Sequence, residues 1–139
     1  MPDILTTQTP VDVVAADEPV RTLLRGSTVT VERHDALRDV ARDLVAGAAD
    51  AALVVSPVGE VGIVTARDIV AAVAAGGAVD DEQVRGVMSS ELVTVEDGES
   101  IAAVGRTMLA ACVRHVVVVD GPRALGVVRL DDVLDALLA

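Results

Sequence analysis

The sequence predicts an α/β protein made of two copies of one βαββα unit, arranged in tandem. Three observations carry this prediction: a gapless internal repeat, short runs of β-branched residues, and amphipathic helical stretches between those runs. Residues 20–75 align with residues 84–139 at a constant offset of 64, and 16 of the 56 aligned positions are identical. Two copies of this length indicate a duplicated small domain, because solenoid repeats are only about 20–50 residues long.

The first copy begins with a short helical turn and a β-branched strand. An amphipathic helix comes next, with Leu37, Val40, Ala41, Leu44 and Val45 at the i, i+3, i+4, i+7, i+8 spacing of one apolar face. Two strands joined by a Pro–Gly turn follow, and a second helix ends the copy. In chain order, these elements are expected at 20–24, 28–31, 36–46, 52–55, 61–64 and 66–75.

The second copy repeats this order, with nearly continuous valine runs in its strands. Such runs are typical of strands that are buried on both faces. The elements are expected at 84–88, 92–95, 100–111, 116–119, 125–128 and 130–138.

The domain organisation follows from the repeat. We expect two domains at 20–76 and 84–139, joined by an acidic, glycine-containing linker at 77–83. Residues 1–19 are polar and acidic and contain three prolines, which predicts a flexible N-terminal arm with a short extended piece at 11–15.

Composition excludes several classes of function. The formal net charge of −11 argues against a nucleic-acid partner, and the absence of aromatic residues removes the platforms on which bases stack. No apolar run reaches the roughly 20 residues of a membrane helix, and no signal peptide is indicated. A single cysteine, Cys112, fits a reducing compartment, so we expect a cytoplasmic protein and read Cys112 as a small buried residue.

Chemistry concentrates where the third strand of each copy turns into a helix. The first copy has Gly62-Ile63-Val64-Thr65-Ala66-Arg67-Asp68, and the second has Gly126-Val127-Val128-Arg129-Leu130-Asp131-Asp132. A hydroxyl and a carboxylate three residues apart can hold a ligand at a helix N-terminus, which favours anions. The same spacing is also that of a capping box, and both interpretations stay open. Arg129 cannot cap a helix in this way, yet Asp132 is retained beside it.

A duplicated βαββα unit with a Gly-hydrophobic-hydrophobic-Thr-x-x-Asp turn resembles the CBS domain, and two in tandem resemble a CBS pair, or Bateman module. The resemblance covers about 120 of the 139 residues. It implies two domains packed around a pseudo-twofold axis, with an adenosine compound bound in the cleft between them. The Asp of the turn would hold the ribose, and the Thr would contact a phosphate.

The resemblance also implies which residues bind the ligand. Arg114 and His115, just before a strand of the second copy, would face ligand phosphates, whereas a solvated arginine beside a partly buried histidine is the alternative. His34 is read as a surface residue. The complete implied ligand-binding set is Gly62, Ile63, Thr65, Arg67, Asp68, Arg114, His115, Arg129 and Asp132.

These features predict a non-catalytic regulatory module that binds AMP, ADP, ATP or S-adenosylmethionine and signals by a conformational change. No catalytic set, metal site or cofactor motif is evident: there is no second cysteine, no Gly-x-Ser-x-Gly and no lysine for a Walker motif. We expect a homodimer formed through Ala- and Val-rich helices, and regulation of an enzyme or transporter. The alternative is a ligand-free CBS pair that only dimerises or docks on such a partner.

Overall fold

The computed structural model describes residues 16–24, 28–59 and 61–139. The predicted piece at 11–15 lies outside these residues. The chain forms two compact units, each an α/β layer with a three-stranded sheet and two helices. The continuous unit is Ser27–Leu92, and the split unit combines Val93–Ala139 with the described residues 16–24.

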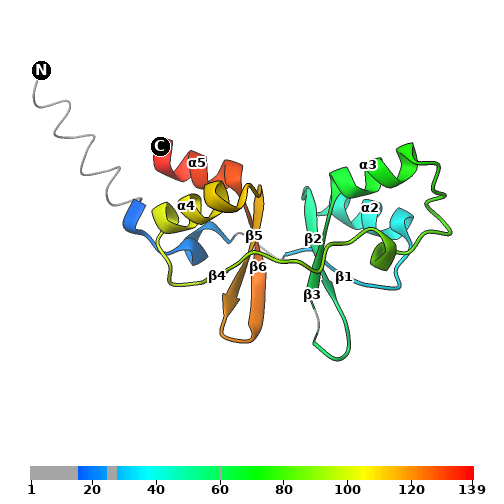
Figure 1. The fold of residues 1–139 in the computed structure, drawn as a ribbon, viewed down its shortest axis with the longest axis horizontal. Helices are drawn as coiled ribbons and strands as arrows, with labels where there is room; N and C mark the ends of the chain where they lie inside the picture. Colours follow the sequence, from blue (N-terminus) through cyan, green and yellow to red (C-terminus); the bar gives the residue numbers. More distant parts are fainter. Residues whose placement is uncertain (1–15, 25–27, 60) are drawn as a thin grey trace, which may run out of the picture. The chain divides into compact units, whose positions relative to one another are not determined.

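The continuous unit carries the elements of the first copy. Its sheet has the order β1-β2-β3, with β1 parallel to β2 and β2 antiparallel to β3. The two helices α2 and α3 lie on one face of this sheet (Figure 1). The elements are β1 (Thr30–Glu32), α2 (Leu37–Ala46), β2 (Ala51–Val55), β3 (Val61–Thr65), α3 (Ala66–Ala74) and the 3-10 helix η2 (Val84–Gly86).

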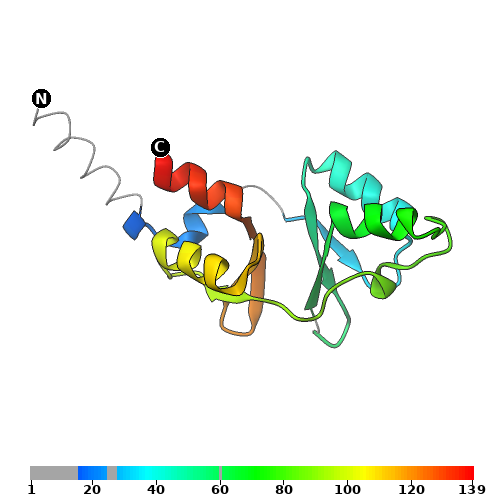
Figure 2. The ribbon, with the colours of Figure 1, turned by 45° about the horizontal axis from the view of Figure 1, so that its top comes forward.

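The split unit repeats the same topology, with a sheet of order β4-β5-β6. Helices α4 and α5 pack side by side, as Figure 2 shows. They approach closely at Gly105, where an added Cβ would lie 3.3 Å from a Val133 methyl carbon. The elements are the 3-10 helix η1 (Val20–Leu23), β4 (Thr94–Glu96), α4 (Ile101–Ala111), β5 (His115–Asp120), β6 (Arg123–Arg129) and α5 (Leu130–Leu138).

Each unit has its own aliphatic core, made of residues at equivalent positions of the two copies. The predicted α/β fold class and the βαββα order of each copy are therefore confirmed. The core of the continuous unit consists of Val31, Leu37, Val40, Leu44, Ala52, Val54, Val64, Ile69 and Val84. That of the split unit consists of Val20, Val95, Ile101, Val104, Met108, Val116, Val118, Val128 and Val133.

The bounds of the compact units differ from those of the sequence copies. Val20 opens the first copy but is fully buried in the core of the split unit, where its N–H donates to the Glu99 carbonyl at 2.7 Å. Val84 opens the second copy but is fully buried in the core of the continuous unit. The end of the N-terminal segment also belongs to the split unit, because Ile101 N donates to the Glu18 carbonyl at 2.9 Å.

Candidate ligand-binding site

The turn between β3 and α3 is held by a complete capping box. Thr65 is the N-cap of α3, and its Oγ1 accepts a hydrogen bond from the Asp68 N–H at 3.1 Å. In return, the Thr65 N–H donates to Asp68 Oδ2 at 2.8 Å. The capping interpretation of this motif is thus confirmed. It satisfies two backbone donors that a helix start would otherwise leave exposed.

Capping does not use up the polar atoms of this turn. A carboxylate has about four lone pairs, and the cap occupies one of them, on Oδ2. In the part of the chain that the structure describes, Oδ1 of Asp68 accepts no hydrogen bond. The Thr65 hydroxyl accepts in the cap and still has its own proton to donate. Both side chains are half-buried, so each is anchored and still accessible.

The other three residues expected in this set surround the turn. Ile63 is half-buried in β3, and Arg67 is exposed in the first turn of α3. Gly62 is buried, and a Cβ there would lie 3.0 Å from Met88 Sδ and 3.0 Å from the Ser89 carbonyl oxygen. Its lack of a side chain therefore serves the packing of the chain around Met88, and its contact with a ligand stays a prediction.

The corresponding turn of the split unit has different chemistry. Arg129 is the N-cap of α5 and makes no side-chain capping hydrogen bond, as the sequence predicts. Its guanidinium instead faces the Asp132 carboxylate, with Nε 3.5 Å from Oδ2 and Nη2 3.4 Å from Oδ1. Both oxygens of Asp132 are therefore directed at one cation, and less of this carboxylate is available to a ligand.

Arg114 and His115 lie beside this second turn. His115 opens β5 and pairs with Arg129 in the antiparallel register of β6. The Arg114 carbonyl accepts from the Leu130 N–H at 2.8 Å, which fixes the backbone at the start of α5. The four site residues expected in the second copy are thus neighbours, as are the five expected in the first.

Two other sequence predictions have clear outcomes. His34 is exposed, as predicted. The prediction for Cys112 is wrong, because its side chain is exposed. Cys112 is the C-cap of α4 and adopts a left-handed conformation with φ of 55°, so it lies past the last helical turn and outside the packed face.

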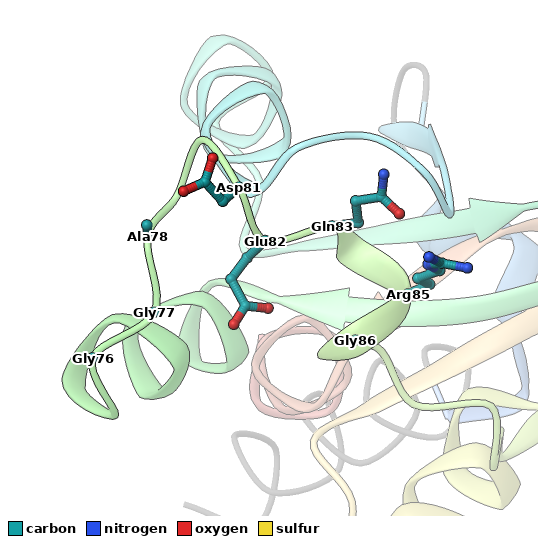
Figure 3. A pocket seen from close by; sticks show the side chains of 8 residues that line it. All are labelled: Gly76, Gly77, Ala78, Asp81, Glu82, Gln83, Arg85 and Gly86. Carbon is teal, nitrogen blue, oxygen red and sulfur yellow. The ribbon is translucent and has the colours of Figure 1, made fainter.

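The linker after α3 forms an open cavity of about 610 Å³ (Figure 3). In that view the carboxylates of Asp81 and Glu82 point in different directions, and the Gln83 amide points away from Glu82. The Gln83 Oε1 atom is buried and accepts no hydrogen bond from the described residues. Among the described residues, no group of three or more His, Cys, Asp or Glu side chains could hold a metal ion. The diverging side chains give this cavity no ligand set.

One surface ion pair near the linker shifts the ionisation of its members. Arg38 on α2 donates from Nε to Asp80 Oδ1 and from Nη2 to Asp80 Oδ2, the latter at 3.2 Å. The hydrogen bond from Arg38 lowers the pKa of the Asp80 carboxyl, and the same bond raises the pKa of Arg38. This pair ties the linker to α2 and lies on the surface.

Comparison with known proteins defines the class. The family model for the CBS domain matches residues 84–139. A CBS-domain containing protein from Agrobacterium tumefaciens is 30% identical, with 86% of this chain and 93% of that chain covered and a TM-score of 0.76. The chain belongs to the CBS-domain family.

Two further solved structures are similar over most of this chain. One is the CBS domain of a CBS domain containing membrane protein from Sphaerobacter thermophilus. It superposes on this chain with a TM-score of 0.82 at 21% sequence identity, and the alignment covers 99% of this chain and 98% of that chain. The other is a CBS domain protein from Pyrobaculum aerophilum complexed with AMP. Its TM-score is 0.75 at 25% sequence identity, and the alignment covers 86% of this chain and 98% of that chain. No curated protein matches the sequence significantly. Within the described ranges, no helix is long and apolar enough to cross a membrane.

Proposed function

We propose that this protein is a regulatory module that binds an adenosine compound at the turn between β3 and α3. The observation that carries the proposal is the half-buried Asp68 carboxylate, whose Oδ2 is fixed by the cap while Oδ1 accepts no bond from the described residues. Two adjacent ribose hydroxyls could donate to such a carboxylate, and charge-assisted hydrogen bonds of this kind are strong. The AMP complex of the Pyrobaculum aerophilum relative supports this ligand class.

The phosphate would depend on side chains more than on the helix terminus. Two N–H groups of the first turn of α3 are already used, because Ala66 N donates to the Asp50 carbonyl and Asp68 N to Thr65 Oγ1. The remaining donors of this turn are the Arg67 N–H, the Thr65 hydroxyl and the exposed guanidinium of Arg67, so two of the three belong to side chains. In a protein with a net charge of −11, a forked cation beside the turn offsets the repulsion of a phosphate.

We assign one such site to each chain. At the second turn, Arg129 replaces the threonine and lies 3.4–3.5 Å from both oxygens of Asp132. A ribose there would have to displace this pair. Arg114 and His115 lie beside Arg129 at the second turn, and their role in binding a phosphate stays a prediction.

Calorimetric titration with AMP, ADP, ATP and S-adenosylmethionine tests the proposal. Asp68→Ala should weaken binding of the preferred compound by about 10- to 150-fold, the effect of losing charged hydrogen bonds of about 1.5–3 kcal/mol. Asp68→Asn keeps an oxygen that can accept from Thr65 N–H but lacks the charge, so it should also weaken binding while leaving the helix cap. Asp132→Asn is the matched control and should change affinity little. Equal affinity in all four proteins would reduce Asp68 to a helix cap.

A second candidate function, a ligand-free interaction module, is favoured by apolar side chains left on the helix surfaces. Val45 on α2 is 82% exposed and Val70 on α3 is 66% exposed, and their equivalents Leu109 and Leu134 are exposed on α4 and α5. Apolar residues at matching positions of both units would serve homodimer formation or docking on a regulated enzyme or transporter. Thermal shift separates the two functions, since ligand at 100 times Kd adds about 2.7 kcal/mol of stability. The cytoplasmic location, based on the single cysteine, stays a prediction.

A further inference from the structure

The continuous unit contains a second cavity, of about 340 Å³, at the opposite end of β3 from the Thr65–Asp68 turn. The strand ends and the segment after η2 enclose it. Its described lining residues are Arg33, Val54, Val55, Ser56, Gly62, Met88 and Ser90. The volume is at the lower end of the roughly 300–1,000 Å³ typical of small-molecule sites. The cavity therefore suits a compound smaller than a nucleotide.

The backbone around this cavity is held in place by hydrogen bonds. Ser89 pairs with Ile63 as an extra antiparallel bridge on β3, through N–H···O bonds of 2.9 Å in each direction. The Arg33 carbonyl accepts from the Arg85 N–H at 2.9 Å, which fixes the chain just after β1. Gly62 permits the close approach of Met88 and Ser89 that forms one wall. The backbone that lines the cavity is thus held by the fold of the continuous unit.

The lining combines one cation with hydroxyls and aliphatic walls. Arg33 supplies a guanidinium, Ser56 and Ser90 supply hydroxyls, and the half-buried Val55 and Met88 supply the apolar surface. No carboxylate is among the described lining residues, in a chain with 22 acidic residues. A guanidinium has five donors, so it can bind an anion while it also keeps a protein partner.

The second copy has the opposite charge at the equivalent positions. At the offset of 64, Asp97 stands in place of Arg33 and Asp120 in place of Ser56, while Gly126 matches Gly62. These two carboxylates would repel an anion that Arg33 and Ser56 would attract. The duplicated fold therefore does not explain the charge of this cavity, because the same fold is built with either set.

From these observations we propose that the cavity binds a small carboxylate with a short branched aliphatic body. The carboxylate pairs with the Arg33 guanidinium and the serine hydroxyls, and the aliphatic body contacts Val55 and Met88. Bidentate pairing with an arginine gives both strength and orientation. Gly62 is the one described lining residue that also belongs to the ligand-binding set expected from the sequence, and the proposal does not depend on the adenosine site.

Amide chemical-shift titration of the full chain with 3-methylbutanoate tests this proposal. The probe should give saturable shifts of the Ser56, Gly62 and Ser90 amides. Its neutral counterpart, 3-methylbutanamide, should bind at least about 10-fold more weakly, because it cannot form the charged pair. Inorganic phosphate should also bind more weakly, because it lacks an aliphatic body. Equal or tighter binding of the amide or of phosphate overturns the proposal, as does the absence of saturable shifts at these amides.

Three variants complete the experiment. Arg33→Gln should weaken 3-methylbutanoate binding by about 10- to 150-fold. Ser56→Asp, which introduces the residue of the second copy, should weaken it as well. Arg123→Gln makes the same charge change at an exposed position of the split unit and should leave binding unchanged. Unchanged amide shifts away from the cavity will show that each variant is folded, and equal affinity in Arg33→Gln and Arg123→Gln contradicts the assignment.

Discussion

Replacing Asp68 by alanine is expected to destabilise the continuous unit by about 1–2 kcal/mol, even without ligand. The substitution removes the 2.8 Å acceptor of the Thr65 N–H. Loss of a capping side chain costs about 0.5–2 kcal/mol, and a buried donor without a partner costs about 1–3 kcal/mol. Thr65 is half-buried, so water can partly replace the lost acceptor, and the value should lie where the two ranges overlap, at about 1–2 kcal/mol.

Asp132→Ala provides the matched control for this prediction. Asp132 occupies the same position in α5 and has the same charge near a helix N-terminus, so effects of the helix dipole cancel. Its side-chain partner is Arg129, and the two side chains are 37% and 42% exposed. A partly exposed ion pair of this kind contributes only about 0–1 kcal/mol.

Urea unfolding followed by circular dichroism will measure both variants, since the chain has no tryptophan or tyrosine for fluorescence. The free energy of unfolding should fall clearly more for Asp68→Ala than for Asp132→Ala. Equal losses, or a larger loss for Asp132→Ala, would show that the capping hydrogen bonds contribute little and would refute the reasoning.

Three further predictions concern assembly, stoichiometry and ionisation. Light scattering should give a mass near twice 14.2 kDa, and a 14.2 kDa species at micromolar concentration contradicts the dimer. Val70→Glu places a charge on an exposed apolar position of α3 and should shift the mass toward that of a single chain. Calorimetry should find one nucleotide site per chain. Arg129→Thr should either open a second site or weaken binding at the first. A binding isotherm of Arg129→Thr that equals that of the unsubstituted protein contradicts a role of Arg129. Arg38→Gln should raise the pKa of Asp80 toward its usual value, as measured by NMR titration, and an unchanged Asp80 titration contradicts this. Because the pKa of Asp80 is lowered in the folded protein, the Arg38–Asp80 pair stabilises the fold at pH values above the pKa of Asp80 in the unfolded chain. This stabilisation is lost as the pH falls through the lowered pKa of the folded state.

The sequence predicts the elements well wherever a local pattern determines them. The amphipathic helix expected at 36–46 is observed at Leu37–Ala46, and the helix expected at 130–138 is observed at Leu130–Leu138. The predicted bounds of the first strand are less accurate, because the strand is expected at 28–31 and observed at Thr30–Glu32. Its extent is set by parallel pairing with β2, from Thr30↔Leu53 to Glu32↔Val55, and this pairing is a long-range contact that no local pattern reports.

The sequence predicts which residues lie at the two strand-to-helix turns, but not their hydrogen bonds. The Thr65-x-x-Asp68 spacing permits a cap, a ligand site or both, and only the geometry shows that the cap uses a single carboxylate oxygen. The pairing of Arg129 with Asp132 follows from a simple difference between the copies. The cavity at Arg33 was missed, although the exchange of Arg33 for Asp97 between the copies is visible in the sequence. Each of these details depends on which side chains tertiary packing brings together.

The burial of Val20 in the split unit has a consequence for folding and for dissection of the chain. The continuous unit is inserted within the split unit, because the chain leaves the split unit after residue 24 and returns to it at Val93. The core of the split unit therefore forms only after a loop of about 66 residues has been closed, whereas residues 28–92 need no segment from outside. Loop closure costs entropy that grows with the logarithm of loop length, at about (3/2)RT ln n.

A fragment cut at the repeat boundary, 84–139, lacks Val20, which fills the core of the split unit. A fragment of residues 28–92 keeps every member of its core, and this is the half that should fold by itself and fold first.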